Sequence, residues 1–200
     1  MFTVYGNNDS GNSYKVKLVL EQLQLPYKWV QMDSTRGQTR TAEFLAKNPN
    51  GKVPTLQLED GGFLPESDAI LCYLAEGSVL MPGGRLDRAH VLQWMFFEQY
   101  SHEPYVAVAR SVMRYFPPDS PRRAELPHLI ERGNQALAVM EQHLSREPYF
   151  AARRYTVADI ALYAYTHCTA AGGFELQRFP AVRAWLERVR SQPRHVPLQA

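Results

Sequence analysis

The chain has 200 residues, of which 45% are hydrophobic, and its 22 Lys and Arg residues nearly balance its 20 Asp and Glu residues. This length and composition support a buried core in one or two domains and exclude a disordered chain. The basic residues are scattered and no apolar run is long enough to cross a membrane, so neither nucleic acid nor a membrane is a predicted partner.

The first 80 residues alternate short apolar runs with glycine and proline breaks. The predicted strands are residues 2–5, 27–32, 53–58 and 63–64. The predicted helices run from near Ser13 to the break at Pro26, over 42–46 and over 67–74. The resulting order, β-α-β-α-β-β-α, predicts a small mixed sheet, since a helical crossover joins parallel strands and a glycine turn joins antiparallel ones.

The second half has a different sequence pattern, in which apolar residues recur at helical spacing over long segments. The predicted helices are residues 87–115, 121–144, 157–171 and 181–191. Residues 79–86 hold Pro82 and two glycines and are predicted as a linker. We therefore expect an α/β domain at 1–78 and an all-helical domain at 87–200.

The two cysteines, Cys72 and Cys168, lie far apart in apolar stretches. Neither belongs to a C-x-x-C pair or a zinc-ligand spacing, so no metal site is predicted. The N-terminus has no basic segment followed by an apolar one, as a secretory signal would require. These features together predict a cytoplasmic protein with reduced thiols.

Three short segments resemble the cytosolic glutathione transferase family. They are residues 10–18 (SGNSYKVKL), 48–56 (NPNGKVPTL) and 65–70 (PESDAI), and the likeness extends over almost the whole chain. Ser10 matches the position of the serine in the theta- and zeta-like types, and Asn12 that of the asparagine in the bacterial nu-like type. The resemblance implies a thioredoxin-like N-terminal domain, an all-α C-terminal bundle, a homodimer and a detoxification enzyme that uses glutathione as co-substrate.

The resemblance assigns a glutathione-binding role to Lys52, Val53, Pro54, Glu66 and Ser67. In the family the proline after Val53 is cis, and the Val53 backbone pairs with the tripeptide as a strand edge would. Ser67 opens a helix, where free N–H groups and the helix dipole favour the ligand α-carboxylate. Glu66 would receive the α-ammonium and Lys52 the glycyl carboxylate. The alternatives are a strand-start proline, a helix-capping serine and an ordinary surface lysine.

The glutathione sulfur would act as the nucleophile, and only its thiolate attacks well. Lowering a thiol pKa from about 8.5 by about two units takes about 2.7 kcal/mol. One hydroxyl hydrogen bond gives about 0.5–1.5 kcal/mol and a helix N-terminus about 0.3–1 kcal/mol, so both are needed. Ser10 is the first candidate donor, Asn12 its rival and Ser13 the third; each could instead be only an N-cap. Tyr5 is interpreted as strand core.

In the helical half, Thr156 and Asp159 have the spacing of a capping box, so Asp159 is assigned to folding. In the family the first helix of this half lines both the dimer interface and the second-substrate pocket. Tyr105, Arg110 and Arg114 are candidates for that pocket.

Three functions are compatible with these residues. The leading one is conjugation of glutathione to a hydrophobic electrophile. Glutathione-dependent reduction of a peroxide or disulfide is the alternative in the redox class, and Asn12 favours it. A non-catalytic interaction module is the third, although a scaffold has no need for Ser10, Glu66 and Ser67. A glycine-rich nucleotide loop is missing, which argues against kinases and dehydrogenases.

Overall fold

The computed structural model describes residues 1–198, which divide into two compact units. The first consists of residues 1–81 together with 193–198, and the second of residues 82–192. The boundary at Pro82 falls inside the segment expected to link the domains, while the last described residues group with the first unit and not with the helical one.

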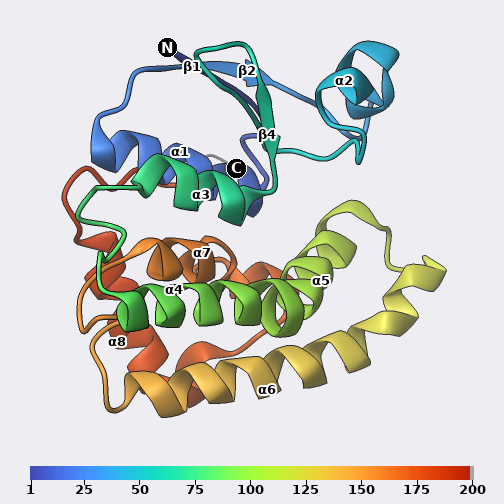
Figure 1. The fold of residues 1–200 in the computed structure, drawn as a ribbon. Helices are drawn as coiled ribbons and strands as arrows, with labels where there is room; N and C mark the ends of the chain where they lie inside the picture. The colour runs from blue at the N-terminus through green and yellow to red at the C-terminus, as the bar shows by residue number, and fades with distance from the viewer. Residues whose placement is uncertain (199–200) are drawn as a thin grey trace. The chain divides into compact units, whose positions relative to one another are not determined.

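The first unit contains the mixed sheet that the sequence predicts. Its strands are β1 (Phe2–Gly6), β2 (Tyr27–Gln31), β3 (Thr55–Gln57) and β4 (Phe63–Pro65). The strand order is β2-β1-β3-β4, with β1 and β2 parallel and the other pairs antiparallel (Figure 1). Val4 pairs with Trp29 on one side and with Leu56 on the other, and Leu56 pairs with Leu64. The thioredoxin-like topology is confirmed.

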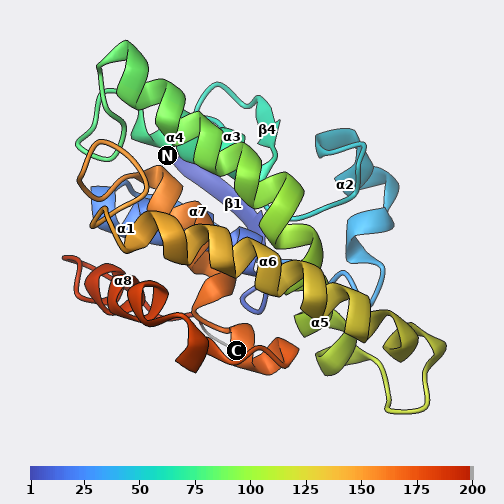
Figure 2. The same ribbon diagram turned by 90° about the horizontal axis from the view of Figure 1, so that it is seen from below.

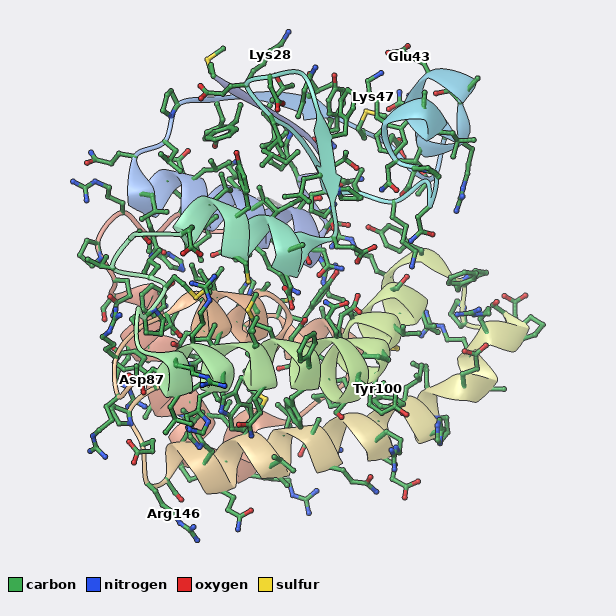
Figure 3. The ribbon with its side chains drawn as sticks, viewed as in Figure 1. Lys28, Glu43, Lys47, Asp87, Tyr100 and Arg146 are labelled. Carbon is green, nitrogen blue, oxygen red and sulfur yellow. The ribbon has the colours of Figure 1, made fainter. Side chains whose placement is uncertain are left out.

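The helices of this unit are α1 (Gly11–Leu23), α2 (Ala42–Lys47) and α3 (Ser67–Ala75), with a 3-10 turn η1 (Gln38–Arg40) before α2. Figure 1 shows α1 and α3 side by side along one face of the sheet, and the two helices pack directly on each other. α2 packs through Phe44 against Tyr5 of β1. Figure 3 shows Glu43 and Lys47 together on α2, where they form an ion pair of 2.9 Å.

Two boundaries in this unit differ from prediction for clear reasons. α1 begins at Gly11, before Ser13, because the Ser10 hydroxyl accepts the Ser13 N–H and acts as N-cap. β3 begins at Thr55 and not at residue 53. Pro54 has no N–H to donate to a neighbouring strand, so the ladder starts after it.

The second unit is all-helical, as predicted. Its α-helices are α4 (Arg85–Phe97), α5 (Glu103–Tyr115), α6 (Leu126–Leu144), α7 (Val157–Thr166) and α8 (Pro180–Arg190). Shorter turns are η2 (Glu98–His102), η3 (Pro121–Glu125), η4 (Thr169–Gly172) and η5 (Leu176–Arg178). In Figure 2, α7 lies between α4 and α8, and it packs on both. All ten residues of α7 are buried, so this helix is the core of the unit.

The single helix expected over residues 87–115 is interrupted by η2, a π-helical turn. Pro104 follows immediately in the first turn of α5. A proline has no N–H and its ring collides with the carbonyl four residues earlier, so regular α-helical bonding cannot continue through this point. The helix expected to reach residue 171 likewise ends at Thr166 and is followed by η4.

The predicted capping box at the start of α7 is confirmed. Thr156 and Asp159 exchange the reciprocal backbone and side-chain bonds that define it. The Asp159 carboxylate also accepts from the Phe150 N–H at 3.2 Å and from Trp185 Nε1 at 2.9 Å. Asp159 is fully buried, and this burial raises its pKa to about 6. One carboxylate therefore joins α7, α8 and the segment between α6 and α7.

The described C-terminal segment, residues 193–198, returns to α1. The buried Tyr14 donates its hydroxyl proton to the Val196 carbonyl at 2.7 Å and lies 3.2 Å from His195 Nε2. Within residues 1–198, no helix is both long and apolar enough to cross a membrane.

Candidate functional site

Two of the three candidate thiol donors at the start of α1 are partly accessible, namely the N-cap residue Ser10 and Asn12 in the first turn. Ser10 and Asn12 are both half-buried, whereas Ser13 is fully buried. The Ser13 hydroxyl accepts the Asn7 N–H at 3.1 Å, which fixes the loop against the helix. Ser13 thus supports the loop, and its side chain is less accessible than those of Ser10 and Asn12.

Ser10 caps α1 with its hydroxyl oxygen and can still donate its hydroxyl proton to a ligand. Its oxygen accepts the Ser13 N–H at 3.2 Å, and an accepted bond leaves the hydroxyl proton able to point elsewhere. The first turn of α1 contains no acidic residue. The positive end of this 13-residue helix is therefore not neutralised from within, and an anion such as a thiolate would be stabilised there.

The start of α3 has an unusual backbone. Glu66 precedes the helix with φ of 68° and ψ of 112°, a region that residues with a side chain rarely adopt. Its side chain is exposed and makes no capping bond. Such conformations cost about 1–3 kcal/mol and cluster at ligand-binding sites. The positive φ of Glu66 therefore motivates the hypothesis that this residue contacts a ligand.

Ser67 is the first helical residue of α3, so the capping alternative does not describe it. It is 5% exposed, and its hydroxyl donates to Asn12 Oδ1 at 3.4 Å. The first turn of α3 also provides N–H groups that have no partner within the helix. The two helix N-termini thus meet through a side-chain contact between Ser67 and Asn12.

Lys15, which the sequence motifs did not single out, lies next to this contact. Its side chain is fully buried, and Nζ lies 3.4 Å from Ser67 Oγ and 3.1 Å from Asp68 Oδ1. Val16 and Val19 beside it on α1 are fully buried too. A charge on the apolar face of a helix was the signal available in the sequence.

The segment before β3 is held by Asn48. Its amide donates to the Lys52 carbonyl at 2.8 Å and to Thr55 Oγ1 at 3.2 Å. The Lys52 side chain is exposed, Val53 is half-buried, and the Val53–Pro54 peptide bond is cis, as the resemblance implies. The five residues assigned to glutathione binding therefore lie on two short segments of one unit.

Comparison with known proteins assigns the chain to a family. Residues 9–76 match the model of the glutathione S-transferase N-terminal domain, and residues 106–193 match that of the C-terminal domain. The chain is 32% identical to the disulfide-bond oxidoreductase YfcG of Escherichia coli, over 91% of this chain and 87% of that protein. The chain belongs to the glutathione S-transferase family.

Other members are similar over nearly their whole length. Glutathione S-transferase GstB of Escherichia coli is 28% identical, over 96% of this chain and 95% of that protein. A crystal structure of a glutathione S-transferase from Pseudomonas fluorescens is 55% identical and superposes with a TM-score of 0.97, covering 100% of this chain and 99% of that one. The family resemblance drawn from the three sequence segments is confirmed.

The three candidates for a second-substrate pocket of this glutathione S-transferase family member lie on α5 in different surroundings. Tyr105 is half-buried, with its ring 6.1 Å from that of His128 and the Arg132 guanidinium 5.4 Å from its centroid. Arg110 is buried, whereas Arg114 is exposed. None of the three lines the hollow of about 350 Å³ in this unit, which is bordered by Trp94, His143, Glu147 and Phe150.

Tyr5, interpreted as strand core, lies in β1. Its ring packs near those of Phe44 and Phe63, with centroids 6.3 Å from each, and its hydroxyl donates to Gln57 at 3.4 Å. Lys47 Nζ lies 5.6 Å from the centroid of the same ring. These contacts fit a structural residue of the sheet.

Proposed function

We propose that this family member binds glutathione in its first unit and activates the thiol for attack on a hydrophobic electrophile. The observation that carries the proposal is the 3.4 Å contact between Ser67, at the start of α3, and Asn12, in the first turn of α1. Two positive helix ends favour two anions, and glutathione provides them as its α-carboxylate and its thiolate.

The proposed roles of the individual residues are those that the family resemblance implies. Ser67 and the first N–H groups of α3 bind the α-carboxylate, and Glu66 receives the α-ammonium. Val53 pairs with the cysteinyl backbone, and Lys52 meets the glycyl carboxylate. Ser10 or Asn12 donates a hydrogen bond to the sulfur, and α1 adds the field of its N-terminus.

Substitution at the two accessible donors tests which of them activates the thiol. One lost hydrogen bond of about 0.5–1.5 kcal/mol corresponds to a rise of about 0.4–1.1 units in the pKa of the bound thiol. We expect Ser10→Ala to raise the pKa of the bound thiol and to lower turnover more than affinity. The pKa is measured through the ultraviolet absorbance of the thiolate. Ser67→Ala should weaken binding of glutathione in calorimetry. Ser34→Ala, in an exposed loop position, is the matched control.

Two results would alter the assignment. If Ser10→Ala leaves turnover unchanged and Asn12→Ala abolishes it, Asn12 is the activating residue. If the unmodified protein binds no glutathione in calorimetry, both the site and the function are wrong, and a non-catalytic module becomes the better account.

Reduction of a disulfide is the second candidate function. The similarity to YfcG, which is named a disulfide-bond oxidoreductase, and the place of Asn12 in the site both favour it. Here the bound thiolate attacks one disulfide sulfur, the other sulfur leaves as a thiolate, and a second glutathione resolves the mixed disulfide. Parallel rates with an aromatic chloro-nitro electrophile, a hydroperoxide and hydroxyethyl disulfide distinguish the three reactions.

We also propose a homodimer. Leu86 and Phe96 of α4 are each 69% accessible and Tyr100 of η2, labelled in Figure 3, is 84% accessible. Large apolar side chains gathered at helical spacing on an exposed face are typical of an interface. Light scattering should give twice the chain mass, and Phe96→Lys with Tyr100→Lys should give a monomer. A monomeric unmodified protein would refute this.

A further inference from the structure

Lys15 is a fully buried lysine whose role the functions above leave unexplained. A lysine side chain is almost never completely buried unless it is paired, because the ammonium loses its hydration. Here Nζ lies 3.1 Å from Asp68 Oδ1 and 3.4 Å from Ser67 Oγ. An apolar side chain in place of Lys15 would avoid the desolvation cost of the buried ammonium. A role other than packing is therefore indicated for this lysine.

The Lys15 ammonium lies at the N-terminus of α3, where the helix dipole disfavours a positive charge. Ser67 and Asp68 form the first turn of α3, where the helix dipole is positive and a cation is repelled. Asp68 supplies one compensating negative charge, and its Oδ2 is buried without a hydrogen-bond partner among the described residues. An ammonium and a helix N-terminus together favour a further anion at the surface of this turn.

The hydrogen bonds also fix the direction of one proton. A serine hydroxyl has a single proton to donate and accepts with its lone pairs. The Ser67 oxygen accepts from Lys15 Nζ, so its proton must point to another acceptor. In this structure that acceptor is Asn12 Oδ1. Donation by a charged group polarises the hydroxyl and strengthens it as a donor in turn.

We infer that Lys15 is a positioning residue that makes Ser67 a dedicated hydrogen-bond donor to the α-carboxylate of glutathione, with Asp68 holding the ammonium in place. The inference rests on the proposed function. A carboxylate arriving at the start of α3 takes over the Ser67 proton, and this releases Asn12 Oδ1 from its contact. Binding at the carboxylate end is thereby coupled to the residue that lies beside the thiol.

A ligand without the carboxylate provides the test. In γ-aminobutyryl-cysteinyl-glycine the α-carboxylate of glutathione is replaced by hydrogen, while the ammonium, thiol and glycyl group remain. Calorimetry with both ligands is carried out on the unmodified protein, Lys15→Met, Ser67→Ala and the double variant. Lys17→Met is the matched control, because Lys17 lies on the same helix with its Nζ 5.6 Å from the centroid of the Trp29 ring.

We expect Lys15→Met to raise the Kd for glutathione by about tenfold or more, as for a lost hydrogen bond to a charged group, and to leave the Kd for the analogue within about twofold. The double variant should bind glutathione no more weakly than the weaker single variant, since both changes remove the same interaction. Lys17→Met should leave both Kd values unchanged. Lys15→Gln, which retains a donor, should recover part of the loss.

Equal loss for both ligands would show that Lys15 only supports the fold, and an unchanged Kd for glutathione would show that it does not act on the site. Either result overturns the inference and leaves the proposed function standing. If the unmodified protein binds neither ligand, the proposed function fails as well. Should Lys15→Met not fold in a thermal scan, the comparison of the two ligands is made with Lys15→Gln, whose equal losses would be equally decisive.

Discussion

The buried Asp159 predicts how the stability of the protein depends on pH. Its carboxylate accepts from the Phe150 N–H and Trp185 Nε1 on one oxygen and from the N–H and hydroxyl of Thr156 on the other. These four donors favour the ionised form, but complete burial outweighs them and raises the pKa from 3.8 to about 6.

The direction of the effect follows from proton linkage. In the folded protein Asp159 holds its proton up to about pH 6, whereas in the unfolded chain it loses the proton near pH 4. Between these values the folded state binds more protons, so the free energy of unfolding falls as the pH rises. A difference of about two pKa units corresponds to about 3 kcal/mol, which is present below pH 4 and lost above pH 6.

Urea unfolding at intervals from pH 3.5 to 7.5 measures this contribution as the difference between the unmodified protein and Asp159→Asn. We expect Asp159→Asn to be less stable throughout, with a difference that shrinks by about 3 kcal/mol between pH 4 and 6. Glu187→Gln is the control, since Glu187 is 66% exposed in its ion pair with Arg190. A difference that is flat with pH, or that grows as the pH rises, would refute the reasoning.

Two further predictions concern the second unit. Thr156→Ala should lower the free energy of unfolding by about 1 kcal/mol through loss of the cap and leave the Kd for glutathione unchanged, so a shifted Kd in calorimetry would contradict a purely structural role. In Gly133→Ala the new Cβ would lie 2.4 Å from Phe174 Cε1. Urea unfolding should show that the free energy of unfolding falls by about 1–3 kcal/mol, and adding Phe174→Leu should restore part of this loss. Gly83→Ala, where an added Cβ meets no heavy atom within 4 Å, should change stability by less than about 0.5 kcal/mol; an equal loss there would refute the clash.

Local sequence patterns predicted most of the fold because proline and glycine residues stand near the ends of the helices and strands. Pro26 follows α1, and Gly61 and Gly62 form the turn between β3 and β4. The capping box at Thr156 was also visible as a four-residue pattern. The π-helical turn η2 was not predicted, because the apolar spacing continues through it and only Pro104 marks the place.

The sequence predicted which segments form the candidate site. It did not predict the side-chain contacts that join those segments. Glu66 and Ser67 were found through motif spacing, which says nothing of the positive φ at Glu66. Lys15 was not singled out, because its sequence neighbours Tyr14 and Val16 do not show that the lysine itself is buried. Its burial depends on α3, more than fifty residues away along the chain, and a contact of that range has no local signature.

The first unit is discontinuous along the chain, and the bond between Tyr14 and Val196 links its two pieces. During synthesis α1 and the sheet leave the ribosome early, yet the acceptor for the Tyr14 hydroxyl is translated more than a hundred residues later. The helical unit is thus inserted between two pieces of its neighbour, and the first unit can reach its final hydrogen bonding only after the second has been made. A fragment cut at the interdomain linker would leave that buried hydroxyl without its carbonyl.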